Sequence, residues 1–162
     1  MKQPVLTLTI SLFMTLLFAQ ERTVNYKDFK IDGLNFITNK SDVIKRFGTP
    51  VKIFKPDYEC GFLSEGQPGG TYYSLQYPYT KFTGNTLNYQ LEEVLFNPKM
   101  RSKVTYKNQA LSHQTTTKEF EKIFGVKISE NEVTIFHENA DDALVFSFVG
   151  GLLFKITYWS PC

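Results

Sequence analysis

Histidine and cysteine are scarce in this chain of 162 residues, which contains two of each. Two histidines leave few options for general acid–base catalysis or for metal binding. His113 lies in a polar segment, while His137 is followed by Glu138, Asp141 and Asp142. A metal site would need these carboxylates in a fixed order, whereas their spacing is typical of the tip of a hairpin. We therefore expect no metal ion and no cofactor.

The net charge of the chain is also small. The chain has 18 Lys and Arg against 16 Asp and Glu, a formal net charge of +2, and removal of Lys2 with a leader would leave +1. Charge this low and this dispersed argues against nucleic acid or an anionic membrane surface as a partner.

Catalytic motifs are absent as well. Gly69 and Gly70 are not followed by the Lys and Ser or Thr of a phosphate-binding loop. Glu92 and Glu93 are neighbours on a predicted strand, so they face opposite sides and cannot form the carboxylate pair of a glycosidase. We expect a protein that is not an enzyme.

The one long hydrophobic run extends from Val5 to Phe18, behind the single early positive charge of Lys2. It is too short and too rich in threonine for a good membrane span, and it predicts a signal peptide over residues 1–20, removed after Ala19 or Gln20. The alternative is a retained membrane anchor. No cysteine lies near the cut, which argues against a lipid anchor. We expect a periplasmic or secreted protein without an integral span in the mature chain.

Cys60 and Cys162 both lie in the exported part. In an oxidising compartment such a pair favours a disulfide, with two free thiols as the alternative. A nucleophilic Cys60 paired with His113 or His137 is a further alternative, although no local signature supports it.

A short segment occurs twice, at residues 38–48 and 115–125. Asn39 with Asp42, and Thr116 with Glu119, follow the pattern of a helix N-cap with an acidic third residue. Apolar residues then recur at helical spacing until Gly48 and Gly125 end each copy. The pattern predicts two short helices, which must pack against a sheet to be stable.

Alternating apolar residues after each helix predict strands, and Gly150-Gly151 predicts a hairpin turn. A bulge or twist near Glu92-Glu93 explains why the apolar face switches within one strand. Residues 97–108 are interpreted as the connection between the copies, with a candidate strand at 103–106. The predicted strands are 51–54, 71–77 and 87–96 in the first half, and 133–137, 144–149 and 152–159 in the second.

The predicted fold class is α+β. Two tandem units, residues 21–98 and 99–162, each consist of a helix followed by an antiparallel meander. We expect them to form one curved sheet, with the short helices packed on one of its faces, as one domain.

Residues 41–50, from Ser41 to Pro50, resemble the helix and turn of the BamE/SmpA/OmlA lipoprotein family. Residues 146–156 are similar to the hairpin that follows this helix in the family, and a tandem of such units looks like the β-lactamase-inhibitor-protein architecture. The resemblance implies a sheet that binds other proteins at the cell envelope. The chain departs from the family at Val126-Lys127, where the family has proline after the glycine, and in lacking a cysteine near residue 20.

Tyrosines are dense between residues 72 and 79. Alternation places Tyr73 and Tyr77 in the core, and we expect Tyr72, Tyr79 and Phe82 to stay exposed, because exposed aromatic residues on a sheet are typical of protein interfaces. The alternative is an ordinary β core. The candidate binding surface comprises Tyr72, Tyr79, Phe82 and Trp159.

The functional expectation is an exported, non-catalytic binding protein of the bacterial cell envelope, engaged in protein–protein interaction or inhibitor-like. One alternative is a carbohydrate-binding module that uses the same tyrosines. Another is a small secreted hydrolase that uses Cys60, or His137 with its acidic turn.

Overall fold

The computed structural model describes residues 23–57 and 69–161. The predicted signal peptide, Cys60 and Cys162 lie outside the described residues, so neither the export signal nor the disulfide is tested. None of the helices in the part of the chain that the structure describes is long and apolar enough to cross a membrane.

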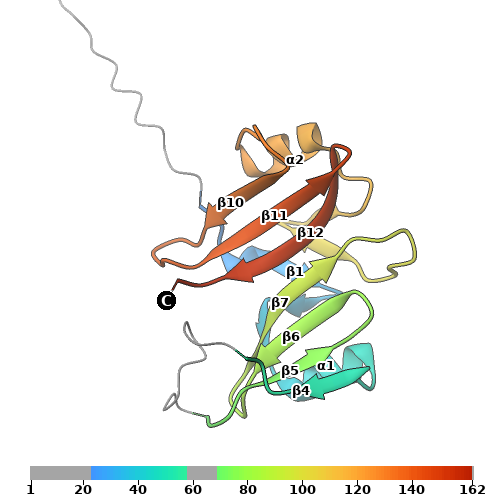
Figure 1. Cartoon of the computed structure of the whole chain (residues 1–162), viewed down its shortest axis with the longest axis vertical. Coiled ribbons are helices and arrows are strands. Elements are labelled where there is room, and N and C mark those ends of the chain that lie inside the picture. The colour runs from blue at the N-terminus through green and yellow to red at the C-terminus, as the bar shows by residue number, and fades with distance from the viewer. Residues whose placement is uncertain (1–22, 58–68, 162) are drawn as a thin grey trace, which may run out of the picture.

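An eight-stranded antiparallel sheet forms the larger layer (Figure 1). Its order is β10-β11-β12-β7-β6-β5-β4, and β3 pairs with β7 beside this path. The halves of the chain meet where β12 pairs with β7. The strands are β3 (Ile37–Thr38), β4 (Lys52–Phe54), β5 (Tyr73–Gln76), β6 (Thr80–Gly84), β7 (Tyr89–Leu95), β10 (Glu132–Phe136), β11 (Ala143–Val149) and β12 (Leu152–Trp159).

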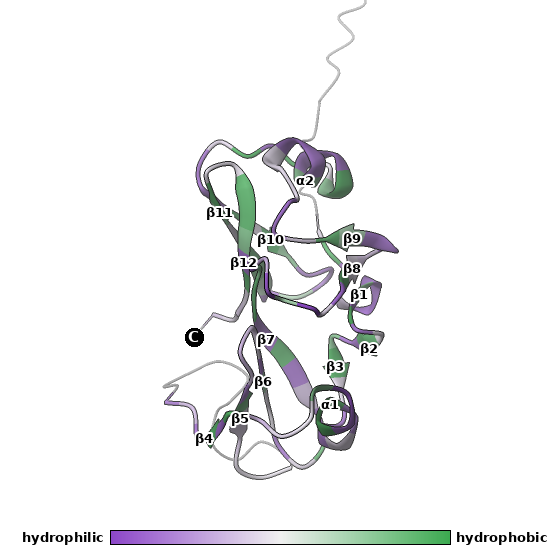
Figure 2. Cartoon of the chain, turned by 90° about the vertical axis from the view of Figure 1, so that its right-hand side faces the viewer, coloured by the Kyte–Doolittle hydropathy of each residue, from purple (hydrophilic) through white to green (hydrophobic). Residues whose placement is uncertain are grey.

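A four-stranded antiparallel sheet of order β2-β1-β8-β9 belongs to the second layer. Figure 2 shows this small sheet opposite the large one, with a helix at each end of it. The elements of this layer are the 3-10 helix η1 (Tyr26–Asp28), β1 (Phe29–Ile31), β2 (Leu34–Asn35), α1 (Lys40–Phe47), β8 (Val104–Tyr106), β9 (Gln109–Leu111) and α2 (Thr117–Phe124).

The predicted α+β class with one curved sheet covered by helices is wrong. The described residues are mainly β, with two sheets and two α-helices of eight residues each. The difference arises because residues 29–35 and 104–111 pair with one another to form the small sheet. These strands have two or three residues each, so they carry too little alternation to reveal a second sheet in the sequence.

Both predicted helices are confirmed, and the ends of α2 follow the expected chemistry. In α2 the Thr116 side chain accepts a hydrogen bond from the Glu119 amide, the Glu119 carboxylate accepts one from the Thr116 amide, and Gly125 ends the helix in the left-handed conformation, with φ of 67°. Asn39 begins α1 without a side-chain cap hydrogen bond.

The antiparallel meander of β10, β11 and β12 is confirmed, as is the turn at Gly150-Gly151. The predicted bulge is confirmed too, since Lys81 pairs with Glu93 and Phe82 with Leu91, which leaves Glu92 as the extra residue. β6 was not predicted, because Thr80–Gly84 alternates weakly and follows Pro78.

A continuous core fills the space between the layers and contains residues from both halves of the chain. The Phe29 ring on β1 lies 4.7 Å from that of Tyr106 on β8, 6.1 Å from Phe124 on α2 and 6.3 Å from Phe146 on β11. At the other end, the Phe47 ring on α1 lies 5.3 Å from Phe82 on β6. Each helix is therefore anchored to the large sheet by aromatic side chains.

Candidate functional site

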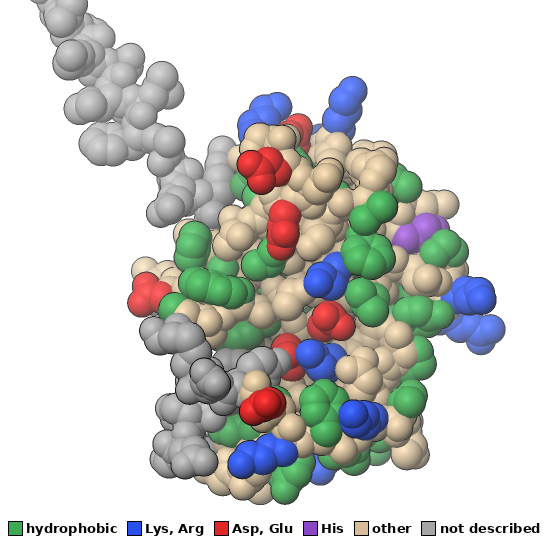
Figure 3. Space-filling view, in the orientation of Figure 1, with side chains coloured by type: hydrophobic (Ala, Val, Ile, Leu, Met, Phe, Trp, Pro, Cys, Tyr) green, Lys and Arg blue, Asp and Glu red, His purple; other side chains and the backbone are tan. Residues whose placement is uncertain are grey.

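The outer face of the large sheet, on the side away from the second layer, is the candidate site. Strand alternation places Ile156 and Tyr158 in the core, so Thr157 and Trp159 point to the outer face. Figure 3 looks onto this face and shows hydrophobic side chains gathered at both sides of its upper half, with acidic and basic side chains between and below them.

Two groups of exposed apolar side chains lie at opposite ends of β10–β12. Phe136 and Trp159 are in one cross-strand row, and their rings meet edge to face at 6.3 Å. Val149 and Leu152 are paired beside the hairpin turn, and Phe154 is the extra residue of a bulge opposite β11. Their exposed fractions are 38% for Phe136, 44% for Trp159, 63% for Val149, 42% for Leu152 and 44% for Phe154.

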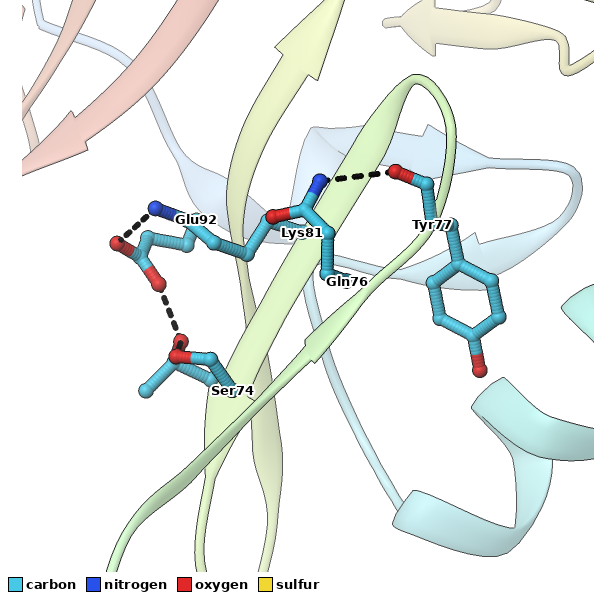
Figure 4. Close-up of polar contacts among 6 residues, drawn as sticks. Ser74, Gln76, Tyr77, Lys81 and Glu92 are labelled. Carbon is cyan, nitrogen blue, oxygen red and sulfur yellow. Dashed lines mark hydrogen bonds and ion pairs between the residues drawn. The ribbon is translucent and has the colours of Figure 1, made fainter. Parts of the chain in front are cut away.

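A buried polar cluster lies on the same side of the sheet, on β5, β6 and β7. Figure 4 shows Ser74, Lys81 and Glu92 on the side away from α1, with Tyr77 pointing toward the helix. Lys81 Nζ lies 2.9 Å from Glu92 Oε1, and the Thr83 hydroxyl donates to Glu92 Oε2. Because this uses the proton of Thr83, the Ser74 hydroxyl donates across the 2.6 Å Ser74–Thr83 contact.

Burial, and secondarily the charge of Glu93, raises the pKa of Glu92 to about 7 despite the ion pair with Lys81. The side chain of Glu92 is only 7% exposed. A buried carboxyl with a raised pKa resembles a catalytic acid. Glu92 accepts a hydrogen bond from the Thr83 hydroxyl and pairs with the Lys81 ammonium group, and the Ser74 hydroxyl joins the cluster through Thr83.

The predicted surface residues do not form one surface. Phe82 is fully buried opposite Leu75, so the expectation that it stays exposed is wrong. Tyr72 and Tyr79 are half-buried, whereas Trp159 is exposed. Tyr73, expected in the core, is 43% exposed.

His137 and the acidic turn do not form a catalytic pair in the structure. His137 Nδ1 lies 2.8 Å from the Val24 carbonyl oxygen, and its ring stacks on Tyr26 at 4.0 Å. Asp142 accepts a hydrogen bond from the Tyr158 hydroxyl at 2.9 Å. Burial and the charge of Asp142 raise the pKa of Tyr26, and burial raises the pKa of Tyr158 to about 12, so neither phenol is a base near neutral pH. These groups hold residues 24–26 against β10.

His113, in the segment before α2, is half-buried. Within residues 23–57 and 69–161, no group of three His, Cys, Asp or Glu side chains is placed to hold a metal ion.

Sequence reasoning missed the apolar residues that accompany Trp159. Phe136 and Phe154 were counted only as members of strands. Phe136 alternates with Val133 and Ile135, which predicts that it faces the opposite side from the core, so that signal was present. Phe154 is exposed because of a bulge that no pattern in the sequence predicts.

No protein-family model, no curated protein and no solved structure matches this chain. The resemblance to the BamE/SmpA/OmlA family therefore remains a prediction from short motifs.

Proposed function

We propose that the protein is an exported, non-catalytic binding protein of the bacterial cell envelope, and that it engages another protein through the outer face of the large sheet. The observation that carries this proposal is the exposure of five large apolar side chains on β10–β12: Phe136, Val149, Leu152, Phe154 and Trp159.

The chemistry of the face supports a protein partner. Aromatic side chains on a rigid backbone give contact area at low entropic cost and are enriched among the residues that dominate binding energy. Phe136 and Trp159 supply such an anchor, and Thr134 and Thr157, in the next row of the same strands, supply polar groups beside it.

The charge of the layer indicates the kind of partner. The segments that carry β4–β7 and β10–β12, residues 51–57, 69–96 and 128–161, contain four Lys against eight Asp and Glu. A partner with a basic rim around an apolar centre would complement this surface. Export is supported by the signal-peptide pattern of residues 1–20, and an envelope role by the family resemblance.

The test is affinity capture from a bacterial envelope extract, followed by measurement of the affinity of the purified partner. Phe136→Ala combined with Trp159→Ala should weaken binding by about 2 kcal/mol or more, since central aromatic residues contribute most to such interfaces. Val51→Ala combined with Ile53→Ala is the matched control, because these residues are 74% and 53% exposed on or beside β4.

The control variant should retain the partner, and circular dichroism should show that both variants are folded. Equal binding by wild type and the Phe136/Trp159 variant, or capture of no protein at all, would contradict the proposal.

A further inference from the structure

Charge is divided unequally between the two layers. The segments that build η1, the small sheet and both helices, residues 23–50 and 97–127, contain twelve Lys and Arg against five Asp and Glu. The large-sheet segments have the opposite balance, with four Lys against eight acidic residues. The low net charge of the whole chain therefore conceals a polarised molecule, and the second layer is strongly basic.

Two of these cations, Lys30 and Lys103, lie on the outward side of the small sheet, here called the basic face. Lys30 lies in the middle of β1 between the buried Phe29 and Ile31, so its side chain points outward. Lys103 precedes the buried Val104 on the neighbouring strand and is exposed as well. Thr105 is the partner of Lys30 in the register, so Lys103 lies on the diagonal, where side chains are about 7–8 Å apart.

Further cations extend the basic face at both ends of β1. Arg46 of α1 reaches Asp32, with a nitrogen–oxygen distance of 3.2 Å, and Lys107 lies 3.9 Å from Asp28. These pairs engage Asp28 and Asp32, the two carboxylates that flank β1 in the chain. Lys30 and Lys103 are described with no ion pair, so their charges are available to a ligand.

The side chains between the cations are small or polar. Lys30 pairs with Asn35 on one side and Thr105 on the other, and Ala110 continues the row on β9. Asn35 also lines a hollow of about 490 Å³, together with Lys27 and the side chains of Tyr26, Phe36 and Ile37. The basic face thus combines the positive charges of Lys30 and Lys103 with the amide of Asn35 and the hydroxyl of Thr105.

The side chains around these lysines favour some classes of polyanion over others. Single-stranded nucleic acid binds to exposed aromatic rings, and the exposed rings of the described residues, Tyr73, Phe136, Phe154 and Trp159, all lie on the large sheet. Membrane-surface binding uses bulky apolar side chains next to the basic ones. Of the exposed isoleucines of residues 23–50, Ile44 lies on α1, and Ile37 on β3 lies beside the basic face at the hollow that it shares with Asn35. One exposed isoleucine at the margin of this face is a small apolar area for insertion into a membrane.

We propose that the basic face binds a linear acidic polysaccharide, with Lys30 and Lys103 pairing with its carboxylate or sulfate groups and Asn35 and Thr105 hydrogen-bonding to its hydroxyl groups. This proposal does not depend on the protein-binding role of the outer face, because the two surfaces lie on opposite layers.

The probe is heparin, a linear polymer that carries both carboxylate and sulfate groups, and its affinity is measured by titration and by salt elution from a heparin column. Lys30→Gln combined with Lys103→Gln should weaken binding about tenfold and lower the eluting salt concentration. Lys52→Gln combined with Lys55→Gln removes the same charge from the β4 end of the large sheet and should leave binding unchanged. Circular dichroism of each variant shows whether the fold is intact.

Equal weakening by both double substitutions would mean that net charge alone drives retention, and would overturn the proposal. Stronger binding at equal salt to vesicles of phosphatidylglycerol and phosphatidylcholine, or to single-stranded DNA, would also overturn it. Elution of the wild type below physiological salt would do the same.

Discussion

Glu92 shows how one residue inserted into a strand changes the chemistry of a sheet. Glu92 faces the side of the sheet opposite to Leu91, and yet both residues are buried, because Glu92 lies in the cluster of Ser74, Thr83 and Lys81. The Thr83 hydroxyl and the Lys81 ammonium group replace part of the water that the carboxylate loses.

The raised pKa of Glu92 predicts a dependence of stability on pH. Between about 4.5 and about 7 the folded protein holds the Glu92 proton and the unfolded chain does not, so the free energy of unfolding falls as pH rises through this range. The contribution is at most about 3 kcal/mol. In Glu92→Gln this part of the slope should disappear, as measured by denaturant unfolding at several pH values.

Glu132→Gln on β10 is the matched control, since Glu132 is exposed. Its unfolding free energy should follow the wild-type dependence on pH. A slope for Glu92→Gln equal to that of wild type would mean that Glu92 is ionised at pH 5 in the folded protein.

At the scale of elements, the two copies of the repeated segment make equivalent helices with unequal caps. Thr116 and Glu119 exchange hydrogen bonds with each other's backbone amides. Asn39 instead donates from its side chain to Asp42 at 3.2 Å and leaves the helix amides without a side-chain acceptor from the cap. Similar sequences therefore stabilise their helix ends to different degrees.

Removal of each cap should reveal this difference. Thr116→Ala is expected to lower the free energy of unfolding by about 1 kcal/mol, whereas Asn39→Ala should cost only about a few tenths of that value, because it removes no cap hydrogen bond. Denaturant unfolding of both variants at neutral pH measures the two effects. A larger loss for Asn39→Ala would refute the assignment of the caps.

Local sequence signals made the helices predictable, whereas the pairing of strands that are distant in the sequence made the sheets hard to predict. The N-cap residue, the apolar residues at helical spacing and the terminal glycine lie close together in the sequence, so α2 could be located from the sequence alone. The pairing of β1 with β8 joins segments far apart in the chain, and each strand is three residues long. Phe82 was misplaced for a related reason: β6 was not recognised, so the alternation that buries it opposite Leu75 could not be applied.

At the scale of the whole molecule, the core predicts cooperative unfolding. Phe29 contacts rings from β8, α2 and β11, and the same core continues to Phe82 and Val43 in the first half. A repeat protein with separable halves would lack a core that is shared between the halves.

Phe29→Ala should lower the free energy of unfolding by about 3–5 kcal/mol, through the cavity that it leaves, while a single transition is retained. Leu87→Ala, at a residue 59% exposed, should change stability by less than about 0.5 kcal/mol. Calorimetry measures both effects. Two separate transitions in either protein would show that the halves unfold independently.

The bridge between Val24 and His137 also affects how the protein behaves at high concentration. Val24 donates to the Phe136 carbonyl and accepts from the Glu138 amide, which occupies the C-terminal end of the outer edge of β10. At the opposite end of the sheet, β4 carries Lys52 and is followed by Lys55 and Pro56. Occupied or charged edges disfavour strand-to-strand aggregation, so the sheet can present apolar side chains on its face without polymerising through its sides.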